Sequence, residues 1–442
     1  MTELFFLILQ FFIIYFLLSF HLFAVFKKSP VLSNFSFSEK ISFNSIIFLN
    51  FILVFSFFNT SLEIIIISYF FYVFFLFFIY VYKFKKLVFE LNQNFFYFII
   101  FFITSSVIFI EVANNLVIGW DAEKFWIYKT LNFYNGNSVD DLANLYNPSY
   151  PYLGSLVWSF FWKVSFLQNE YSGRLFYVFI YLSSLLLFIN NFKINIFYKI
   201  IFFTLFIIIS YDYTHHSNWS VFSGFQEILI FSLLTMAMHF LYNLSSFKGK
   251  LDNFNLVSIL LICNLLVWIK LEGFVISLSL IVTLVLFFDL KIKKKIYISV
   301  IFLFIIFLRF FIFDFYNLNT TGTQHVGFDL QNLNNIIEKF SASRYLMVLK
   351  SLFLNLLSNY LTLISLFILA IFLITKQNLK KIYYVLFFAA FNMTSFCGIY
   401  IITDLDLTWM LKTGMDRIVY QFSPFSLLLI LEFYNLKIRN KN

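Results

Sequence analysis

Long apolar segments alternate with short polar ones along almost the whole chain, and this pattern predicts transmembrane helices. Most apolar segments approach the roughly 20 residues that a helix needs to cross a hydrocarbon core of about 30 Å. No polar stretch is long enough to form a separate soluble domain. We therefore expect an all-α polytopic membrane protein with about 13 transmembrane helices. The expected spans are 3–26, 44–58, 63–82, 95–113, 174–190, 194–211, 221–243, 254–270, 274–290, 296–313, 345–373, 383–403 and 417–434.

Three apolar segments depart from the regular length of a span. Segment 44–58 is short, and 345–373 is long enough to tilt or to contain an interfacial turn. Segment 153–167 is apolar but short, and counting it as a span would move every later basic cluster to the outer side. We interpret it as an amphipathic or re-entrant helix at the outer interface, with Trp158 and Trp162 at headgroup level.

The basic residues indicate the orientation of the chain. They form clusters between the expected spans, and with this span list all clusters fall on one side, which the positive-inside rule makes cytoplasmic. The N-terminus is then outside and the C-terminus inside. The clusters are Lys27 and Lys28; Lys83, Lys85 and Lys86; Lys248 and Lys250; Lys291, Lys293, Lys294 and Lys295; Lys376, Lys380 and Lys381; and Lys437, Arg439 and Lys441.

Acidic residues and histidines gather on the opposite side, which favours a functional site on the extracytoplasmic face. The largest outer segment is the loop 114–173, which we expect to carry short interfacial helices. Two adjacent histidines in a loop are more often solvated than bound to a metal. The other outer residues of this kind are Asp212, His215, His216, Glu272, His325, Asp404, Asp406 and Asp416.

Composition supports the membrane assignment and excludes several other classes. The chain of 442 residues is 61% hydrophobic and 12% charged, and a soluble protein has about twice that charged fraction. A net charge of +9 would suggest nucleic acid in a soluble protein, but here it reflects topology, so we expect no nucleic-acid partner. Cys263 and Cys397 both fall in expected spans, and no disulfide framework is implied. The first apolar run lacks a basic leader and a cleavage site, which indicates a retained span.

Asp121 and Glu123 lie between tryptophans where the chain leaves the membrane. At positions i and i+2 of a helix they point to different faces. A carboxylate partly desolvated beside Trp120 and Trp126 would be more basic and could act as a general base. The alternative is that Asp121 caps a helix over 122–133.

Glu227 lies near the outer end of an apolar run, and an intramembrane carboxylate is a functional candidate by default. The alternative is that it pairs with a lysine such as Lys270. Lys270 could equally pair with Glu272, or bind a phosphate as a point charge.

Arg417 begins an expected span on the non-cytoplasmic side, against the positive-inside trend. Its partner is either an aspartate, Asp416 or Asp406, or a lipid-linked phosphate that arginine can bind bidentately. A further feature is Tyr150, which lies between Pro148 and Pro151 in a stiff, extended connector. No HExxH, CxxC, P-loop or GxSxG pattern is present.

Taken in order, these segments resemble bacterial GT-C-type glycosyltransferases, in particular the integral-membrane group related to protein mannosyltransferases and aminoarabinose transferases. The resemblance covers about 95–434. It divides the chain into an N-terminal three-helix membrane segment (1–94), a GT-C-like domain (95–434) and a cytoplasmic tail (435–442). The residues that carry it are Gly119, Trp120, Asp121 and Ala122; Tyr150 and Pro151; Lys270, Glu272 and Gly273; Asp406, Leu407 and Trp409; and Asp416, Arg417 and Pro424.

The resemblance implies an enzyme of a bacterial plasma membrane that acts on its outer face. Such an enzyme transfers a sugar from a polyprenyl-phosphate donor to a glycolipid, glycan or protein acceptor by inverting displacement. Asp121 would be the catalytic base, and Lys270 and Arg417 would neutralise the lipid phosphate. Some relatives use a divalent cation and others do not, so a cation is possible and none is predicted. The remaining substrate-binding candidates are Glu123, Glu227, Glu272 and Tyr150.

Two alternatives stay open. A transporter or flippase of lipid-linked sugars would need polar residues through the membrane depth and often contains inverted repeats, and neither is evident. A surface-polysaccharide ligase or polymerase would favour several outer arginines, and the chain offers Arg174, Arg344 and Arg417. The chain also departs from the GT-C pattern, because Glu227 follows Gly224-Phe225-Gln226 where relatives often have an aspartate after Gly-Tyr-Ala.

Overall fold

The computed structural model describes residues 2–19, 36–84, 93–211, 221–246, 252–319, 339, 341–374, 382–403 and 405–439. Within these ranges the protein consists of helices joined by turns and short loops, with no β-strand. The expectation of an all-α protein is confirmed for this part of the chain. The elements are α1 (Thr2–Ser19), α3 (Phe37–Ser56), α4 (Leu62–Phe84), α5 (Gln93–Asn114), η1 (Ala122–Trp126), α6 (Ile127–Tyr134), η2 (Asp140–Asn144), α7 (Leu153–Lys163), α8 (Tyr171–Ile189), α9 (Ile196–Tyr211), α10 (Glu227–Ser246), α11 (Asp252–Ile269), α12 (Leu271–Phe287), α13 (Ile292–Phe315), α15 (Ala342–Ser358), α16 (Tyr360–Ile374), α17 (Tyr383–Ile402), α18 (Leu407–Phe422) and α19 (Pro424–Arg439).

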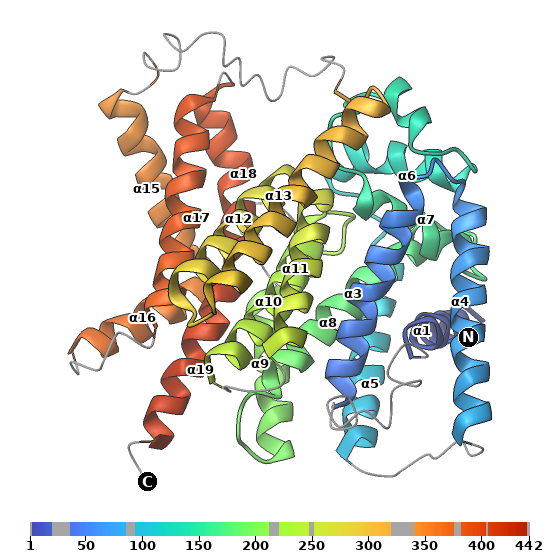
Figure 1. The fold of residues 1–442 in the computed structure, drawn as a ribbon, viewed down its shortest axis with the longest axis horizontal. Coiled ribbons are helices and arrows are strands. Elements are labelled where there is room, and N and C mark those ends of the chain that lie inside the picture. Colours follow the sequence, from blue (N-terminus) through green and yellow to red (C-terminus); the bar gives the residue numbers. More distant parts are fainter. Residues whose placement is uncertain are drawn as a thin grey trace.

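The described ranges contain 8 helices long and apolar enough to cross a membrane, or up to 9 with one bent pair. This supports a multi-pass membrane protein, but the expected count of about 13 spans is not confirmed. Three expected spans correspond to shorter apolar helices, α1, α9 and α12. Figure 1 shows α1 nearly end-on, across the direction of α4 and α5.

The expected span 417–434 is divided in the structure, because α18 ends at Phe422 and α19 begins at Pro424. Proline has no N–H to donate to the preceding turn, so a helix can start at Pro424 but cannot continue through it. Helix α18 starts ten residues earlier than expected, where Asp406 Oδ1 accepts a hydrogen bond of 2.7 Å from Trp409 N. Arg417 therefore lies inside a helix and not at the start of a span.

The long segment 345–373 contains a turn, as the sequence suggested. Helices α15 and α16 meet at Asn359 with a bend of 93°. The break is capped, since Asn359 Oδ1 accepts from Thr362 N at 3.1 Å. A side-chain acceptor at the first free N–H of a helix removes much of the cost of interrupting the backbone ladder.

Segment 153–167 forms the short helix α7, and its burial corrects the expected headgroup position of Trp158. Residues 153–161 are all buried, because α6 and α8 pack against this helix. Trp158 was expected among headgroups, yet it is fully buried and its Nε1 donates to Glu170 O at 3.3 Å. Trp162 is half-buried and stacks on Tyr134 with ring centroids 4.2 Å apart.

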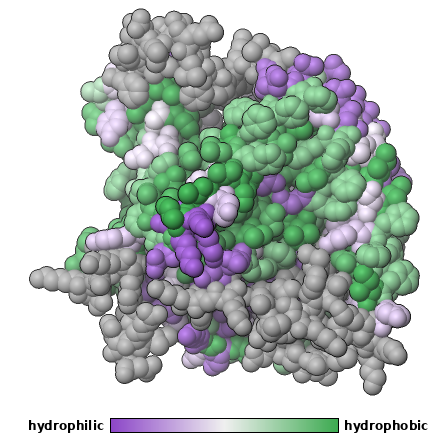
Figure 2. Space-filling model, in the orientation of Figure 1, coloured by the Kyte–Doolittle hydropathy of each residue, from purple (hydrophilic) through white to green (hydrophobic). Residues whose placement is uncertain are grey.

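The core is centred on α8, in which every residue from Tyr171 to Ile189 is buried. Helices α3, α5, α7 and α10 pack around it. Figure 1 shows α6 and the neighbouring loops at one end of the bundle. Figure 2 shows hydrophilic residues over that end, a second hydrophilic group lower on the same face, and hydrophobic residues between them.

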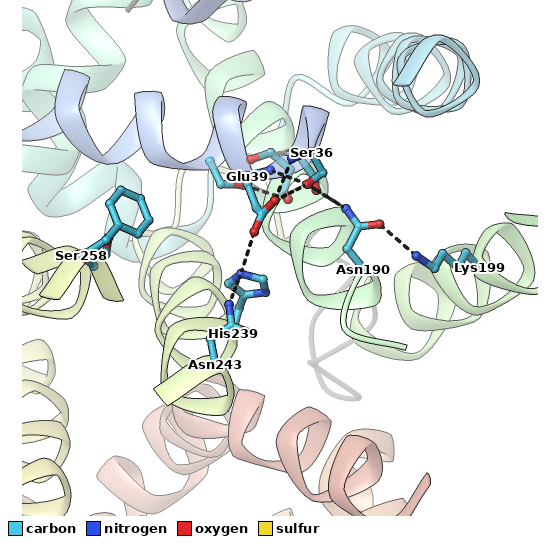
Figure 3. Close-up of polar contacts among 11 residues, drawn as sticks. Ser36, Glu39, Asn190, Lys199, His239, Asn243 and Ser258 are labelled. Carbon is cyan, nitrogen blue, oxygen red and sulfur yellow. Dashed lines mark hydrogen bonds and ion pairs between the residues drawn. The ribbon is translucent and has the colours of Figure 1, made fainter. Parts of the chain in front are cut away.

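A polar cluster ties α3, α8 and α10 together far from the start of α10 (Figure 3). Glu39 forms a capping box with Ser36 at the beginning of α3. Asn190 Nδ2 donates to Ser36 Oγ at 3.3 Å, and His239 Nε2 lies 3.9 Å from Glu39 Oε1. His239 comes twelve residues after Glu227 on α10, roughly 18 Å along the helix axis. These contacts fasten three helices to one another at that depth.

Candidate active site

Five charged side chains from distant parts of the chain meet where several helices begin or end, and we call them the charge network. The sequence predicts that each of them lies on the outer face. Its members are Asp121 immediately before η1, Glu227 at the start of α10, Lys270 between α11 and α12, Glu272 in the first turn of α12, and Arg417 in α18.

Glu227 is the centre of this network. Its Oε1 accepts hydrogen bonds from Arg417 Nε at 2.6 Å and from Lys270 Nζ at 2.9 Å. The Arg417 Nη2 group donates to both Glu227 and Asp121. Lys270 Nζ also lies 3.0 Å from Glu272 Oε1. One continuous set of ion pairs therefore links residues separated by as many as 296 positions.

The side chains of the network range from fully buried to partly exposed. The Glu227 side chain is 0% exposed, whereas those of Arg417 and Asp121 are 15% and 18% exposed. The buried Oε2 of Glu227 makes no hydrogen bond within the described part of the chain. An incoming molecule would thus meet Asp121 and Arg417 first, with Glu227 behind them.

Asp121 is free to reach Arg417 because it does not cap a helix. It stands at the N-cap position of η1, a single π-helical turn, yet its side chain makes no capping hydrogen bond. The alternative that Asp121 serves as a cap is therefore not what the structure shows. Turns of π-helix inside α-helices occur frequently at functional sites.

The loop before α10 contacts Arg417 through Phe225. Phe225 places its ring 5.0 Å from the Arg417 guanidinium carbon, in cation–π geometry. Gly119 N donates to Ser223 O at 2.8 Å, which joins this loop to the one that carries Asp121. A Cβ at Gly119 would lie 2.2 Å from Phe225 Cζ, so any larger residue would displace the Phe225 ring.

A break between α11 and α12 positions Lys270. Its backbone is extended (φ −155°, ψ 160°), and α12 starts at the next residue. Gly273 allows α12 to cross close to α11, since a Cβ there would lie 2.0 Å from Leu266 O. Burial acts to lower the pKa of Lys270, but the carboxylates of Glu227 and Glu272 outweigh it and hold that pKa above its usual value. Lys270 therefore stays charged.

Tyr150 lies beside the network on the connector before α7. Its ring stacks on Phe125 with centroids 5.3 Å apart and meets Trp126 edge-on at 5.7 Å. Burial, followed by the charge of Glu272, raises the pKa of Tyr150 to about 12. The phenol therefore keeps its proton at neutral pH and can donate a hydrogen bond.

Glu123 is the one site candidate that the structure places apart. It is exposed and pairs with Lys124 at 3.2 Å, which agrees with the expectation that it faces away from Asp121. Of the two aspartates considered for Arg417, Asp406 caps α18, and Asp416 Oδ1 accepts from the Arg417 backbone N at 2.8 Å. The expected outer residues Asp212, His215, His216, His325 and Asp404 lie outside the described residues.

Two contributors were not singled out from the sequence. No sequence pattern indicates that the Phe225 ring would contact an arginine. Lys129, in the loop 114–173, is fully buried. As for metals, the ranges that the structure describes hold no group of three or more His, Cys, Asp or Glu side chains arranged to bind one. The network carboxylates all lie against cationic side chains.

Comparisons of the chain with protein-family models, with curated proteins and with solved structures find no match.

Proposed function

We propose that this protein is a membrane glycosyltransferase that moves a sugar from a polyprenyl-phosphate donor to an acceptor at the extracytoplasmic face of the plasma membrane. The observation that carries the proposal is the meeting of Asp121, Lys270 and Arg417 around one buried carboxylate. These are the residues to which the GT-C resemblance assigns the base and the phosphate contacts. Their convergence from separate segments is what a single active site requires.

The proposed donor phosphate binds to Arg417. Of the two carboxylates on this guanidinium, Glu227 is fully buried and is also bound to Lys270, so it stays in place. Asp121 is partly exposed and is the partner that a phosphate can replace. A planar guanidinium can grip a phosphate bidentately. Donor binding thus releases Asp121 from its ion pair and leaves its carboxylate available as a base.

The chemical step is a single displacement. Asp121 takes the proton of an acceptor hydroxyl, and the acceptor oxygen forms a bond to the anomeric carbon of the sugar. The bond between that carbon and the phosphate oxygen breaks on the opposite face, so the configuration inverts. The electron pair leaves with the lipid phosphate, where Lys270 and Arg417 stabilise the developing negative charge.

The remaining residues of the site bind and orient. Tyr150 donates a hydrogen bond to the sugar or phosphate, and the free Oε2 of Glu227 accepts one from a hydroxyl. Glu272 holds Lys270 in position through their 3.0 Å ion pair. Because Glu123 lies in solvent with Lys124, the proposal gives it no part in the chemical step.

The distribution of charge on α10 favours an enzyme over a transporter. Between Glu227 and His239 this helix carries no charged residue. Its two hydroxyl groups in that stretch, Ser232 and Thr235, donate to carbonyls of their own helix at 2.6 and 2.8 Å. A carrier of a charged lipid would need a polar route between the two membrane sides.

The proposal is tested by mass spectrometry of glycolipids and surface glycans from a strain that lacks the gene. We expect one sugar to be absent from its acceptor, and its polyprenyl-phosphate donor to accumulate. The wild-type gene and an Asp140→Asn variant, which alters an exposed carboxylate of the same loop, should restore the sugar. An unchanged glycan profile would refute sugar transfer, and donor confined to the cytoplasmic leaflet would favour the flippase.

A further inference from the structure

Lys129 is a buried lysine that the proposed chemistry does not use. It lies on α6, its side chain is 0% exposed, and it makes no ion pair with any described carboxylate. Lysine is almost never fully buried without a partner, because removing an ammonium group from water is costly. Its position therefore needs a structural or functional reason.

The contacts of Lys129 supply that reason. Its Nζ donates to Pro148 O at 3.2 Å and also to Tyr150 O. Both acceptors belong to the connector 147–152, which has no helix or strand of its own to satisfy these carbonyls. The Lys129 amine thus donates hydrogen bonds to two backbone oxygens of the connector, which few other hydrogen bonds hold in place.

The connector is also strained where it starts. Asn147 has a φ of 60°, in the left-handed region that side-chain-bearing residues adopt at a cost. Tyr150 N donates to Asn147 O at 3.3 Å, which closes the turn. A strained turn persists only where surrounding contacts over-determine it, and the two carbonyl bonds to Lys129 are such contacts.

We infer that Lys129 is a positioning residue: by binding the carbonyls of Pro148 and Tyr150 it fixes the Tyr150 side chain beside the charge network. This inference rests on the proposed function only in the use to which Tyr150 is put. Tyr150 is close enough to Glu272, Lys270, Asp121 and Arg417 for their charges to act on its phenol. Its ring packs against Phe125 and Trp126.

The amine can keep this role in either protonation state. Burial lowers the pKa of Lys129 to about 7. The neutral amine retains two N–H donors, which is the number of carbonyls that it serves. The side-chain length and the donors matter more than the charge, and that guides the choice of variants.

The test measures how readily the connector opens, without reference to sugar transfer. The reporter is Ser149→Cys, between the two bound carbonyls, in a background with Cys263→Ala and Cys397→Ala. Purified protein is labelled with a maleimide, and the rate is compared for Lys129→Met and Lys129→Gln. Methionine and glutamine are similar in size, but only glutamine offers N–H donors.

Lys163→Met is the matched control. Lys163 is the last residue of the adjacent helix α7. It also donates to a backbone carbonyl, that of Tyr134, at 2.9 Å. It is partly exposed and pairs with Glu63 at 3.1 Å, and it does not bind the connector.

We expect Lys129→Met to raise the labelling rate about tenfold, because two carbonyls lose their donor, and Lys129→Gln to raise it less. Lys163→Met should leave the rate unchanged. Should Lys129→Met fail to fold, the glutamine variant carries the test. Parental labelling rates in whichever Lys129 variants fold would overturn the inference.

Kinetics in membranes separate this inference from the proposed function. We expect Lys129→Met to raise KM more than it lowers kcat. In a Tyr150→Ala background it should have little further effect, since both changes remove the Tyr150 side chain from its position beside the charge network. Faster labelling in a protein that transfers no sugar would leave the role of Lys129 standing and refute the enzyme. Normal labelling and normal kinetics in Lys129→Met would refute the role of Lys129 and leave the enzyme standing.

Discussion

At the scale of single residues, the protein concentrates its unusual features around Glu227. A fully buried carboxylate with two cations is stable only as a set, since each charge compensates the desolvation of the others. The same arrangement leaves Asp121 on the accessible side of Arg417. Stability and the proposed chemistry therefore depend on different carboxylates of one network.

The first residue-scale prediction concerns Glu227→Gln. Removing this charge leaves Lys270 and Arg417 without their common partner, so we expect the free energy of unfolding to fall by about 3 to 5 kcal/mol. Asp140→Asn, at an exposed position, should change it little. Detergent-solubilised protein can be compared by thermal unfolding. Equal midpoints for Glu227→Gln and wild type would show that the buried pairs contribute nothing.

The second residue-scale prediction is a pH dependence. The pKa of Lys129 is lowered to about 7 in the folded protein from 10.5. Between these values the unfolded chain binds a proton that the folded protein does not, so stability rises as the pH increases from 7 towards 10. Below pH 7 both states are protonated and this contribution is flat.

Lys129→Met should remove this slope. The measurement is the unfolding midpoint of wild type and variant at pH 7 and pH 9, and their difference isolates Lys129 from other titrating groups. We expect the midpoint of wild type to rise more between the two pH values. A larger rise in the variant would contradict the sign.

At the scale of elements, helix ends place the network. The break at Lys270 and the π turn after Asp121 each interrupt a regular helix, and α10 starts at Glu227. Each of these helix ends places a charged side chain in the network. Close crossing of α11 and α12 depends on Gly273. The positions of these charges thus follow from backbone geometry as much as from residue type.

Gly273→Ala tests that dependence. The added Cβ would lie 2.0 Å from Leu266 O, a backbone atom that cannot rotate away. We expect a loss of about 1 to 3 kcal/mol in stability, together with lower activity as Lys270 and Glu272 shift. The control is Gly398→Ala in α17, where a Cβ meets nothing within 4 Å. That variant should be neutral or slightly stabilising. Equal behaviour of the two alanines would remove the argument from close crossing.

The sequence predicted helix type and the network residues better than it predicted spans. The length of an apolar segment identifies a helix that can cross a bilayer. It does not show that Pro424 divides 417–434 into two helices, nor that packing buries α7. Asp121, Glu227, Lys270, Glu272 and Arg417 stand out because charges are rare in an apolar chain. Lys129 and Phe225 do not stand out, since their roles arise only from the fold.

At the scale of the whole molecule, the basic cluster that contains Lys294 and the charge network lie at opposite ends of α11. Lys294 Nζ donates to Asn253 Oδ1 at 2.7 Å near the beginning of this helix, and Lys270 follows its last residue. Eighteen residues of helix separate the ends by about 27 Å. The assignment of these two ends to the cytoplasmic and outer sides stays a prediction. The other basic clusters fall, wholly or in their side chains, outside the described residues.

The sidedness predicts opposite reactivity of two cysteine reporters in intact cells. Asn144→Cys, exposed in the outer loop, should react with a membrane-impermeant maleimide. Lys293→Cys, exposed in the basic cluster, should react only after the membrane is opened. The background lacks Cys263 and Cys397. Reaction of both reporters in intact cells would place the network and the basic cluster on one side.

The most direct test of the account is a transfer assay in membranes that contain wild type or Asp121→Asn, with donor and product followed by mass spectrometry. Wild type should release free polyprenyl phosphate and glycosylate the acceptor. The asparagine variant should insert normally and still bind the donor through Arg417, yet transfer no sugar. Transfer at the wild-type rate by Asp121→Asn would contradict the central role given to this carboxylate.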